Sequence, residues 1–394
     1  MEKIHTEKVS PRKKKRYICC GNNYSRSSIA ASSILYAMDV NYFAIFVTKH
    51  LYYLPQYLPI ADELKKRGRS FLFLLTGEDA PALIEVAANY LTREGYACCD
   101  FAKNPVQLSC KHLICGAHSF PNLQVKYDYA SFVVHGIGTK AGNFTPEQNK
   151  YDIRFVEGSF REQHLRELYP DIKTALYNVG FAKLDPAVNM LPEEKVGLLE
   201  RLSLDKNKKT LLYAPTFYPS SIEYMPRNFP NDFQQYNLII KPHFFSFSKP
   251  AYRHHLKRFR RWAEFPNVYF AGVEDFNLTP YLALADLLIT DESSAIFEFA
   301  ALDKPVICNR NVRYRLIYRI FRSKIKKRME TSLNVFRSIA TNTFTYKELL
   351  EKTLLEIENP ALNQRNRMEM IEKVIGPADG KVSVRIADIL ESYP

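Results

Sequence analysis

The segment from Asp286 to Pro305, DLLITDESSAIFEFAALDKP, has the residue types and order of a phosphate-binding turn. Residues 287–290 are an apolar run with the length of a buried strand, and residues 295–302 have helical spacing. The turn between them places the hydroxyls of Ser293 and Ser294 at a helix start, where backbone N–H groups lack partners and the helix dipole is positive. The alternative is an ordinary N-cap between a strand and a helix.

Glu298 lies one turn into the expected helix. It is four residues after Ser294, whereas a capping box needs a spacing of three, so its carboxylate has no predicted role at the helix end. We therefore expect Glu298 to be free to face a ligand.

A second candidate is the loop HGIGTKAG, which begins at His135 and follows the apolar run at residues 132–134. Glycines let the backbone approach a ligand closely, and imidazole titrates near neutral pH. His135 can thus serve as a general base, with Gly136 and Lys140 beside the ligand. The alternatives are a structural histidine and a loop that is only flexible.

Two further strands end in polar residues. LLYAPT ends at Thr216, and IIKPH ends in Lys241 and His243. A hydroxyl, a cation and an imidazole at neighbouring strand ends can neutralise a pyrophosphate and stabilise a departing nucleotide. The alternative for His243 is a structural role.

Cys110, His112, Cys115 and His118 could suggest zinc, but their spacing is not that of a paired site. If residues 111–115 form a strand, His112 and Cys115 point to opposite faces. We predict no metal site and no obligatory cofactor.

Strands and helices alternate along the chain, which predicts parallel βαβ units. A first series of strands is expected at residues 42–48, 71–75, 112–115 and 132–134, with helices at 54–67 and 81–94. A second series is expected at 174–179, 210–214, 238–241, 268–270, 287–290 and 306–308, with helices at 282–285, 295–302 and 346–358. This predicts an α/β protein of two Rossmann-like domains whose parallel sheets face a central cleft, with ligands bound beyond the carboxyl ends of the strands.

Composition points to a cytoplasmic protein. The chain has 394 residues, is 46% hydrophobic and contains seven cysteines, an odd number that argues against a disulfide framework. It contains no uncharged apolar run of 18 residues, and its basic start is not followed by the apolar stretch of a secretory signal.

The net charge of +13 favours a polyanionic partner. Basic residues gather at 12–16 (RKKKR) and at 311–329, where apolar residues recur at helical spacing. The stretch 312–328 is predicted to lie on an anionic membrane surface as an amphipathic helix. The alternative is a helix whose apolar stripe packs on the core.

These motifs together resemble the CDP-glycerol glycerophosphotransferase family, the teichoic-acid and capsule polymerases and primases of GT-B fold. The resemblance covers roughly residues 130–390 and is carried, in order, by HGIGTK, GFAKLD (180–185), LLYAPT, IIKPH, the segment 285–307 and DGKVSVRI (from 379). It implies transfer of glycerol phosphate or ribitol phosphate from a CDP-alditol to a hydroxyl of a membrane-linked glycan or polyol-phosphate, with release of CMP.

The resemblance also implies roles for single residues. His135 would be the base, with His243 the second catalytic residue. The CDP-alditol would contact Gly136, Lys140, Thr216, Lys241, Asp291, Ser293, Ser294, Glu298 and Lys381. The implied domains are a basic and partly disordered arm (1–40), an acceptor domain (41–170), a CDP-donor domain (171–375) and a C-terminal helix returning across the cleft (376–394).

Two other functions stay open from the sequence. One is a GT-B glycosyltransferase that uses a nucleotide sugar in capsule or lipopolysaccharide assembly. The other is a basic adaptor that binds nucleic acid or membrane, although no nucleic-acid partner is expected because such an adaptor would leave the strand-end motifs without a role. The favoured hypothesis is a cytoplasmic transferase, peripheral on the inner face of the plasma membrane.

Overall fold

Two parallel sheets carry the residues singled out above. The computed structural model describes residues 41–77, 81–101, 107–117, 123–137, 144–312, 314 and 339–394. Both sheets belong to one compact unit, residues 40–394. The predicted α/β class with two parallel sheets is confirmed.

The first sheet has the strand order β3-β2-β1-β4-β5-β6-β7 in the described residues. All of its pairs are parallel, as in the register of Phe46 with Phe73. β2 is a continuous apolar run and β1 is nearly so, as is typical of parallel strands that are covered on both faces. The strands are β1 (Asn41–Thr48), β2 (Phe71–Leu75), β3 (Cys98–Asp100), β4 (Leu108–Cys115), β5 (Val125–Val133), β6 (Ile153–Val156) and β7 (Ala175–Asn178), and the helices are α1 (Leu54–Lys66), α2 (Pro81–Arg93) and α3 (Gly158–Leu168).

The second sheet has the order β10-β9-β8-β11-β12-β13, again with parallel pairs throughout its described strands. Its strands are β8 (Thr210–Ala214), β9 (Asn237–Ile240), β10 (Val268–Phe270), β11 (Leu287–Thr290), β12 (Val306–Asn309) and β13 (Thr341–Thr343). The helices of this half are α5 (Pro192–Arg201), α6 (Phe245–Ser248), α7 (His254–Trp262), α8 (Thr279–Leu284), α9 (Ala295–Ala300), α13 (Tyr346–Glu358) and α14 (Gln364–Val374).

One strand was assigned to the wrong series. We expected residues 174–179 to open the second series, but β7 pairs with β6 at the edge of the first sheet. Its neighbour β6 was missed altogether, because Arg154 interrupts the apolar pattern of IRFV. Arg154 is nevertheless buried, and its Nη2 donates to Gln148 Oε1 at 2.5 Å.

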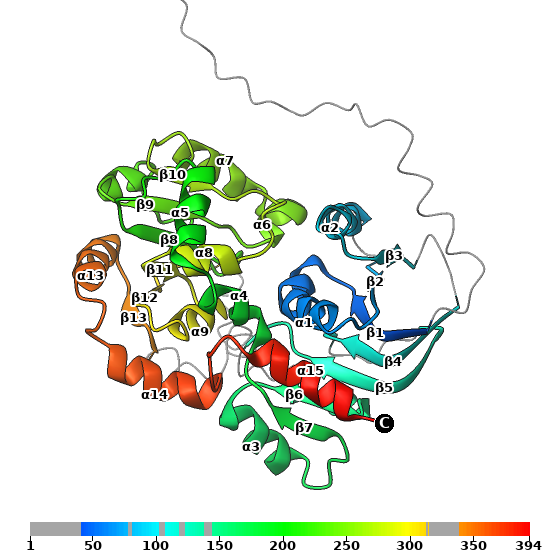
Figure 1. Ribbon diagram of the computed structural model, residues 1–394. Coiled ribbons are helices and arrows are strands. Elements are labelled where there is room, and N and C mark those ends of the chain that lie inside the picture. The colour runs from blue at the N-terminus through cyan, green and yellow to red at the C-terminus, as the bar shows by residue number, and fades with distance from the viewer. Residues whose placement is uncertain are drawn as a thin grey trace, which may run out of the picture. The chain divides into compact units, whose positions relative to one another are not determined.

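The last helix, α15 (Val382–Ser392), returns to the first sheet and lies beside α1 (Figure 1). Its apolar side packs in the same core as the apolar side of α1. Arg67 of the α1 C-cap pairs with Asp388 at 2.7 Å and with Glu391 at 2.9 Å. Arg69 adds a third ion pair, to Glu391, at 2.6 Å. The C-terminal helix is therefore held by apolar packing and a local ion-pair network.

His112 helps to dock this helix. It is fully buried on β4, its Nε2–H donates to the carbonyl of Leu390 at 2.8 Å, and burial lowers its pKa to about 4. Cys110 and Cys115 are buried free thiols on the same strand. His118 lies outside the described residues. The ring of His112 is thus used in helix packing.

The described helices include none with the length and apolarity needed to cross a membrane. The basic segment 12–16 and, apart from Val312 and Tyr314, the predicted amphipathic helix at 312–328 lie outside the described residues.

Candidate active site

Three predicted site residues follow adjacent strands of the second sheet. The central order β9-β8-β11 places the loops carrying Lys241, Thr216 and Asp291 side by side at the carboxyl edge. This is the edge at which open parallel sheets bind ligands. The continuous apolar strands before these residues fix their positions, since every residue of the three strands is buried.

Asp291 organises the loop of Thr216. Its Oδ2 accepts from the N–H of Thr216 at 3.0 Å and from the hydroxyl of Ser220 at 3.2 Å, and its Oδ1 accepts from the N–H of Ser221 at 3.2 Å. Complete burial raises the pKa of Asp291 to about 7, against the opposing effect of these donors. We expected Asp291 to contact the donor, but its described contacts are with this loop.

The Ser-Ser turn opens a short helix, as predicted, although α9 ends at Ala300. Ser293 Oγ lies 3.1 Å from Thr290 Oγ1 and accepts from the N–H of Ala295 at 3.3 Å. Ser294 is the N-cap residue, and its side chain makes no capping bond. Both serines are half-buried, so their hydroxyls lie at the helix start.

Glu298 is not free, contrary to the expectation from sequence. It is 2% exposed, and its Oε2 lies 2.6 Å from the Nζ of Lys183. Lys183 stands in the short η5 turn (Ala182–Leu184), just after the last strand of the first sheet. A buried carboxylate needs such a partner, because an unpaired buried charge is costly.

Lys183 also links the two halves through its backbone. Its N–H donates to the side chain of Gln56 on α1 at 2.8 Å, and its carbonyl accepts from the hydroxyl of Thr279 on α8 at 3.2 Å. One residue thus contacts a helix of the first half, α8 and α9.

Lys241 lies in the same electrostatic environment. Its pKa is lowered to about 8, mainly by burial; the negative charge of Asp275 opposes this shift and the positive charge of Lys183 adds to it. Asp275 in turn accepts from the N–H of Gly272 at 2.8 Å and from the hydroxyl of Tyr269 at 3.1 Å. The charges of Asp275 and Lys183 thus both act on the buried Lys241.

His243 is held in one tautomer. Its Nδ1 accepts from the N–H of Phe245 at 3.0 Å, so in the neutral ring the proton is on Nε2. The ring packs on Phe217 and Phe245, at centroid distances of 4.7 and 5.0 Å. Such a ring presents a donor, which suits contact with a phosphate oxygen.

His135 has the opposite tautomer. It follows β5, and its Nδ1 lies 3.0 Å from the carbonyl oxygen of Gly116. A carbonyl only accepts, so Nδ1 carries the proton and the lone pair is on Nε2. The ring stacks on Tyr53 at 4.6 Å. Next to it, a side chain at Gly136 would meet no atom within 4 Å, and Lys140 lies outside the described residues.

The motifs GFAKLD and DGKVSVRI meet where the chain enters α15. Asp185 accepts from the N–H of Val382 at 3.2 Å, and from both the N–H and the hydroxyl of Ser383 at 2.7 Å. Gly380 has φ +71°, and a Cβ there would lie 2.2 Å from Asn189 Oδ1. Lys381 is the exposed N-cap residue of α15 and donates its N–H to Asp379 at 3.1 Å.

Sequence reasoning missed Lys183 and Asp275 as site residues. Lys183 lies within GFAKLD, a motif that was noted, but its partner Glu298 is 115 positions further along the chain. Asp275 lies in the loop after β10, and its place beyond a strand end could have indicated it as a site residue. A pocket of about 630 Å³ elsewhere, lined by residues of α14 and of the 376–378 turn among others, contains none of the predicted site residues.

Comparison with known proteins decides the family. The sequence profile of the CDP-glycerol:poly(glycerophosphate) glycerophosphotransferase family matches residues 129–392, a range that contains every predicted site residue. The chain belongs to this family. The resemblance inferred from the motifs is confirmed.

Curated relatives include the teichoic acid glycerol-phosphate primase of Bacillus spizizenii, 30% identical over 165 residues, which are 39% of this chain and 39% of that protein. The teichoic acid poly(glycerol phosphate) polymerase of the same organism is 25% identical over 180 residues, 42% of each chain. The matched part therefore spans about two fifths of these relatives.

The fold is similar to that of the wall teichoic acid polymerase TagF. One of its structures, a variant soaked with CDPG, covers 88% of this chain and 87% of that chain at 14% identity, with a TM-score of 0.58. A UDP-N-acetylglucosamine 2-epimerase from Listeria monocytogenes, covering 90% and 96% at 12% identity, gives 0.55. The GT-B assignment is confirmed by these likenesses of fold.

Proposed function

We propose that this protein transfers glycerol phosphate from CDP-glycerol to a hydroxyl at the end of a glycan or polyol-phosphate acceptor and releases CMP. The family match over residues 129–392 carries the proposal, because it includes both histidines and all three strand-end loops. The relatives named for teichoic acid synthesis favour a cell-surface polymer, teichoic acid or capsule, as the product. CDP-ribitol is the alternative donor.

The proposed reaction uses groups of the chain itself. The acceptor oxygen attacks the β-phosphorus, the bond from that phosphorus to the CMP oxygen breaks, and the acceptor proton passes to Nε2 of His135. The tautomer set by Gly116 supports this role. Removal of a positioned base typically costs 10²–10⁴-fold in rate.

On the donor side, Lys241 and the Nε2–H of His243 would offset charge on the diphosphate and on departing CMP. Thr216, Ser293 and Ser294 would add hydroxyl or N–H donors from the adjacent loops. Asp291 would position the Thr216 loop, and Glu298, predicted from sequence to lie near the nucleoside, would instead act through its pair with Lys183, which holds α9 in place. Lys381 would reach the donor from the N-terminus of α15, and Lys140 and Gly136 from the His135 loop.

The domain roles follow from this assignment. We expected an acceptor domain at residues 41–170 and a donor domain at residues 171–375, but β7 (Ala175–Asn178) pairs in the first sheet, so the boundary would lie after β7. The C-terminal helix 376–394 would return to the first half. We further propose that the protein works in the cytoplasm, on the inner face of the plasma membrane, with residues 312–328 touching anionic lipid. Flotation with anionic vesicles, before and after neutralisation of these basic residues, tests the membrane contact.

The test of function is a donor panel. The protein is incubated with a lipid- or glycan-linked acceptor and CDP-glycerol, CDP-ribitol or nucleotide sugars, and the nucleotides released are separated. The proposal expects CMP from a CDP-alditol in the presence of acceptor. If a nucleotide is released only from the nucleotide sugars and not from either CDP-alditol, the glycosyltransferase alternative is correct.

A further inference from the structure

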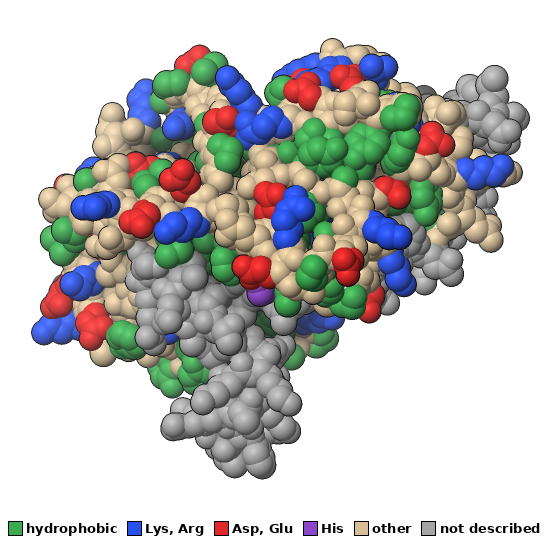
Figure 2. Space-filling view, turned by 90° about the horizontal axis from the view of Figure 1, so that it is seen from below, with side chains coloured by type: hydrophobic (Ala, Val, Ile, Leu, Met, Phe, Trp, Pro, Cys, Tyr) green, Lys and Arg blue, Asp and Glu red, His purple; other side chains and the backbone are tan. Residues whose placement is uncertain are grey.

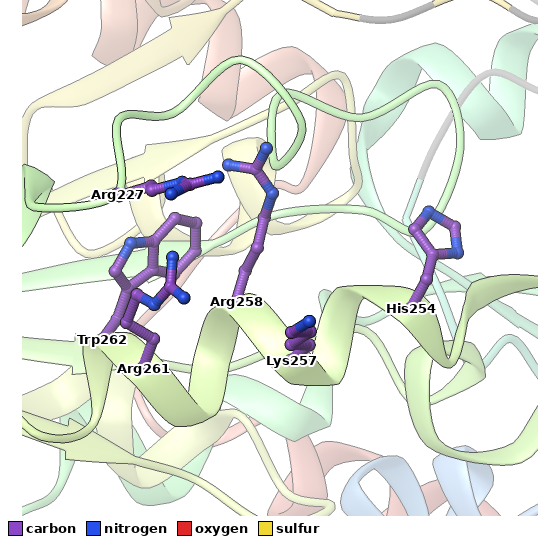
Figure 3. Close-up of a pocket in the computed structure, with 6 residues that line it drawn as sticks. All are labelled: Arg227, His254, Lys257, Arg258, Arg261 and Trp262. Carbon is purple, nitrogen blue, oxygen red and sulfur yellow. The ribbon is translucent and has the colours of Figure 1, made fainter.

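A basic pocket on α7 lies outside the residues assigned to donor binding. It has a volume of about 220 Å³ and is lined by Arg227, His254, Lys257, Arg258, Arg261 and Trp262, which we call the basic pocket (Figure 3). On the face of the molecule shown in Figure 2, Lys and Arg side chains alternate with Asp and Glu side chains. The six described residues that line the basic pocket, in contrast, include no acidic side chain.

The periodicity of α7 builds this pocket. His254, Lys257 or Arg258, and Arg261 recur at helical spacing and share one face, while Phe259 lies on the other side of the helix and is buried in the core. Trp262 is buried at the edge of the pocket. The segment at residues 225–227 forms the second wall of the pocket, and two hydrogen bonds from α7 hold it in place. Arg258 Nη1 donates to the Met225 carbonyl at 2.9 Å, and Trp262 Nε1 donates to the Pro226 carbonyl at 3.1 Å. Arg227 follows directly and completes the pocket.

Among the described residues, the lysine and the three arginines of the basic pocket have no anionic partner. Within the described part of the chain, none of Arg227, Lys257, Arg258 and Arg261 forms an ion pair. Like charges three or four residues apart on a helix repel one another. The helix dipole stabilises the positive charge of Arg261 in the last turn of α7. It does not stabilise the charge of Arg227, which lies in another segment. A bound anion would relieve the repulsion.

The neighbouring carboxylate does not make this a cation site. Glu223 Oε1 lies 3.0 Å from His255 Nε2 and 3.4 Å from His254 Nε2, and the three side chains could by spacing hold a metal ion. A divalent cation there would be repelled by the adjacent arginines and lysine. The charge of the surroundings therefore selects an anion.

A row of aromatic rings connects the candidate active site with the first turn of α7, where His254 lines the basic pocket. Aromatic rings link the two: His243 to Phe217 at 4.7 Å, Phe217 to Tyr252 at 5.1 Å, and Tyr252 to His255 at 6.2 Å between centroids. A chain molecule with one end at the strand-end loops can therefore extend along this surface to α7.

We propose that the basic pocket binds a phosphodiester group of the glycerol-phosphate chain of the acceptor, an inference that rests on the proposed function. Guanidinium groups bind phosphate oxygens by paired hydrogen bonds, and the pocket is small enough to favour a single phosphate with its neighbouring glycerol. A membrane surface is a poorer fit, because a membrane-bound helix needs exposed apolar residues and those of α7 face the core.

The test measures binding without turnover. A short fluorescent oligomer of glycerol phosphate is titrated against the full chain and against Arg227→Gln/Lys257→Gln/Arg261→Gln. The matched control, Lys206→Gln/Lys347→Gln/Lys352→Gln, removes the same charge from exposed positions elsewhere. The pocket variant is expected to bind the oligomer at least about 10-fold more weakly, and the control less than about 2-fold. Binding of CDP-glycerol should be unchanged in both.

Equal weakening in the two variants would overturn the proposal, since binding would then follow net charge alone. It is also overturned if the pocket variant loses binding to anionic phospholipid vesicles but keeps the oligomer. Should the triple variant fail to fold, Lys257→Glu alone is expected to weaken oligomer binding in the same direction. The binding assay does not depend on turnover. If the protein binds the oligomer but releases no CMP, the proposed function is refuted while the binding role of the basic pocket is retained.

Discussion

Lys183 Nζ lies 2.6 Å from Glu298 Oε2, and this pair joins the turn that follows the first sheet to a helix of the second. The lysine side chain is 12% exposed and the glutamate 2%, so both charges depend on each other for stabilisation. The charge of Lys183 also adds to the depression of the pKa of Lys241, whose main cause is burial. A structural contact between the halves is thus part of the electrostatics of the candidate site.

Breaking this pair should destabilise the protein. Lys183→Met leaves a buried carboxylate without its cation and is expected to cost about 3–5 kcal/mol in the free energy of unfolding, measured by urea denaturation. The double variant Lys183→Met/Glu298→Gln should recover part of the loss. The control Lys347→Met removes an exposed ion pair with Glu351 and should cost less than about 1 kcal/mol. Equal losses for Lys183→Met and the control would contradict the account.

Lys241 should set a basic limb in the pH profile. Its folded pKa is about 8, so its charge is present below that pH and is lost above it. We expect kcat/KM for CDP-glycerol to fall as the pH rises through about 8. Stability should respond in the opposite sense, because a depressed lysine pKa contributes stability that grows as the pH rises toward the unfolded value. Lys241→Arg keeps its charge and should move the limb upward, so an unmoved limb would exclude Lys241 as its origin.

Asp291 should make stability fall as the pH rises. Its folded pKa of about 7 is above the ordinary value of 3.8, so between these values the folded state binds the proton more tightly than the unfolded state. Thermal midpoints measured from pH 4 to pH 7 should therefore lose part of their pH dependence in Asp291→Asn. The exposed Asp171→Asn is the control and should leave the curve unchanged. A full pH dependence in Asp291→Asn would refute this assignment.

Two glycines should respond to alanine with opposite signs. Gly380 has φ +71°, and a Cβ would clash with Asn189, so Gly380→Ala is expected to destabilise the protein by about 1–3 kcal/mol. Gly197 lies inside α5 with only the end of Arg201 nearby, so Gly197→Ala should stabilise by about 0.5–1 kcal/mol. Chemical denaturation of both variants checks the pair, and a neutral effect at Gly380 would show that the turn into α15 tolerates a side chain.

The sequence predicted the parts of the fold that rest on local patterns. The strands β8, β10 and β11 and the helix α13 have the predicted bounds, because each is a continuous apolar run or a clear helical period. β6 was missed because a buried arginine, which pairs with Gln148, interrupts its apolar pattern. For the site, strand ends predicted which loops lie together, as for Thr216 and Asp291. The Lys183–Glu298 pair could not be predicted, since it depends on how two remote segments meet.

The measurement that tests the central claim most directly compares turnover and donor binding in His135→Gln. The account predicts that the full chain releases CMP from CDP-glycerol in the presence of a glycerol-phosphate acceptor. It also predicts that His135→Gln lowers kcat by about 10²–10⁴-fold, with the dissociation constant for CDP-glycerol nearly unchanged. Loss of donor binding equal to the loss of turnover, or no CMP from either protein, would contradict it.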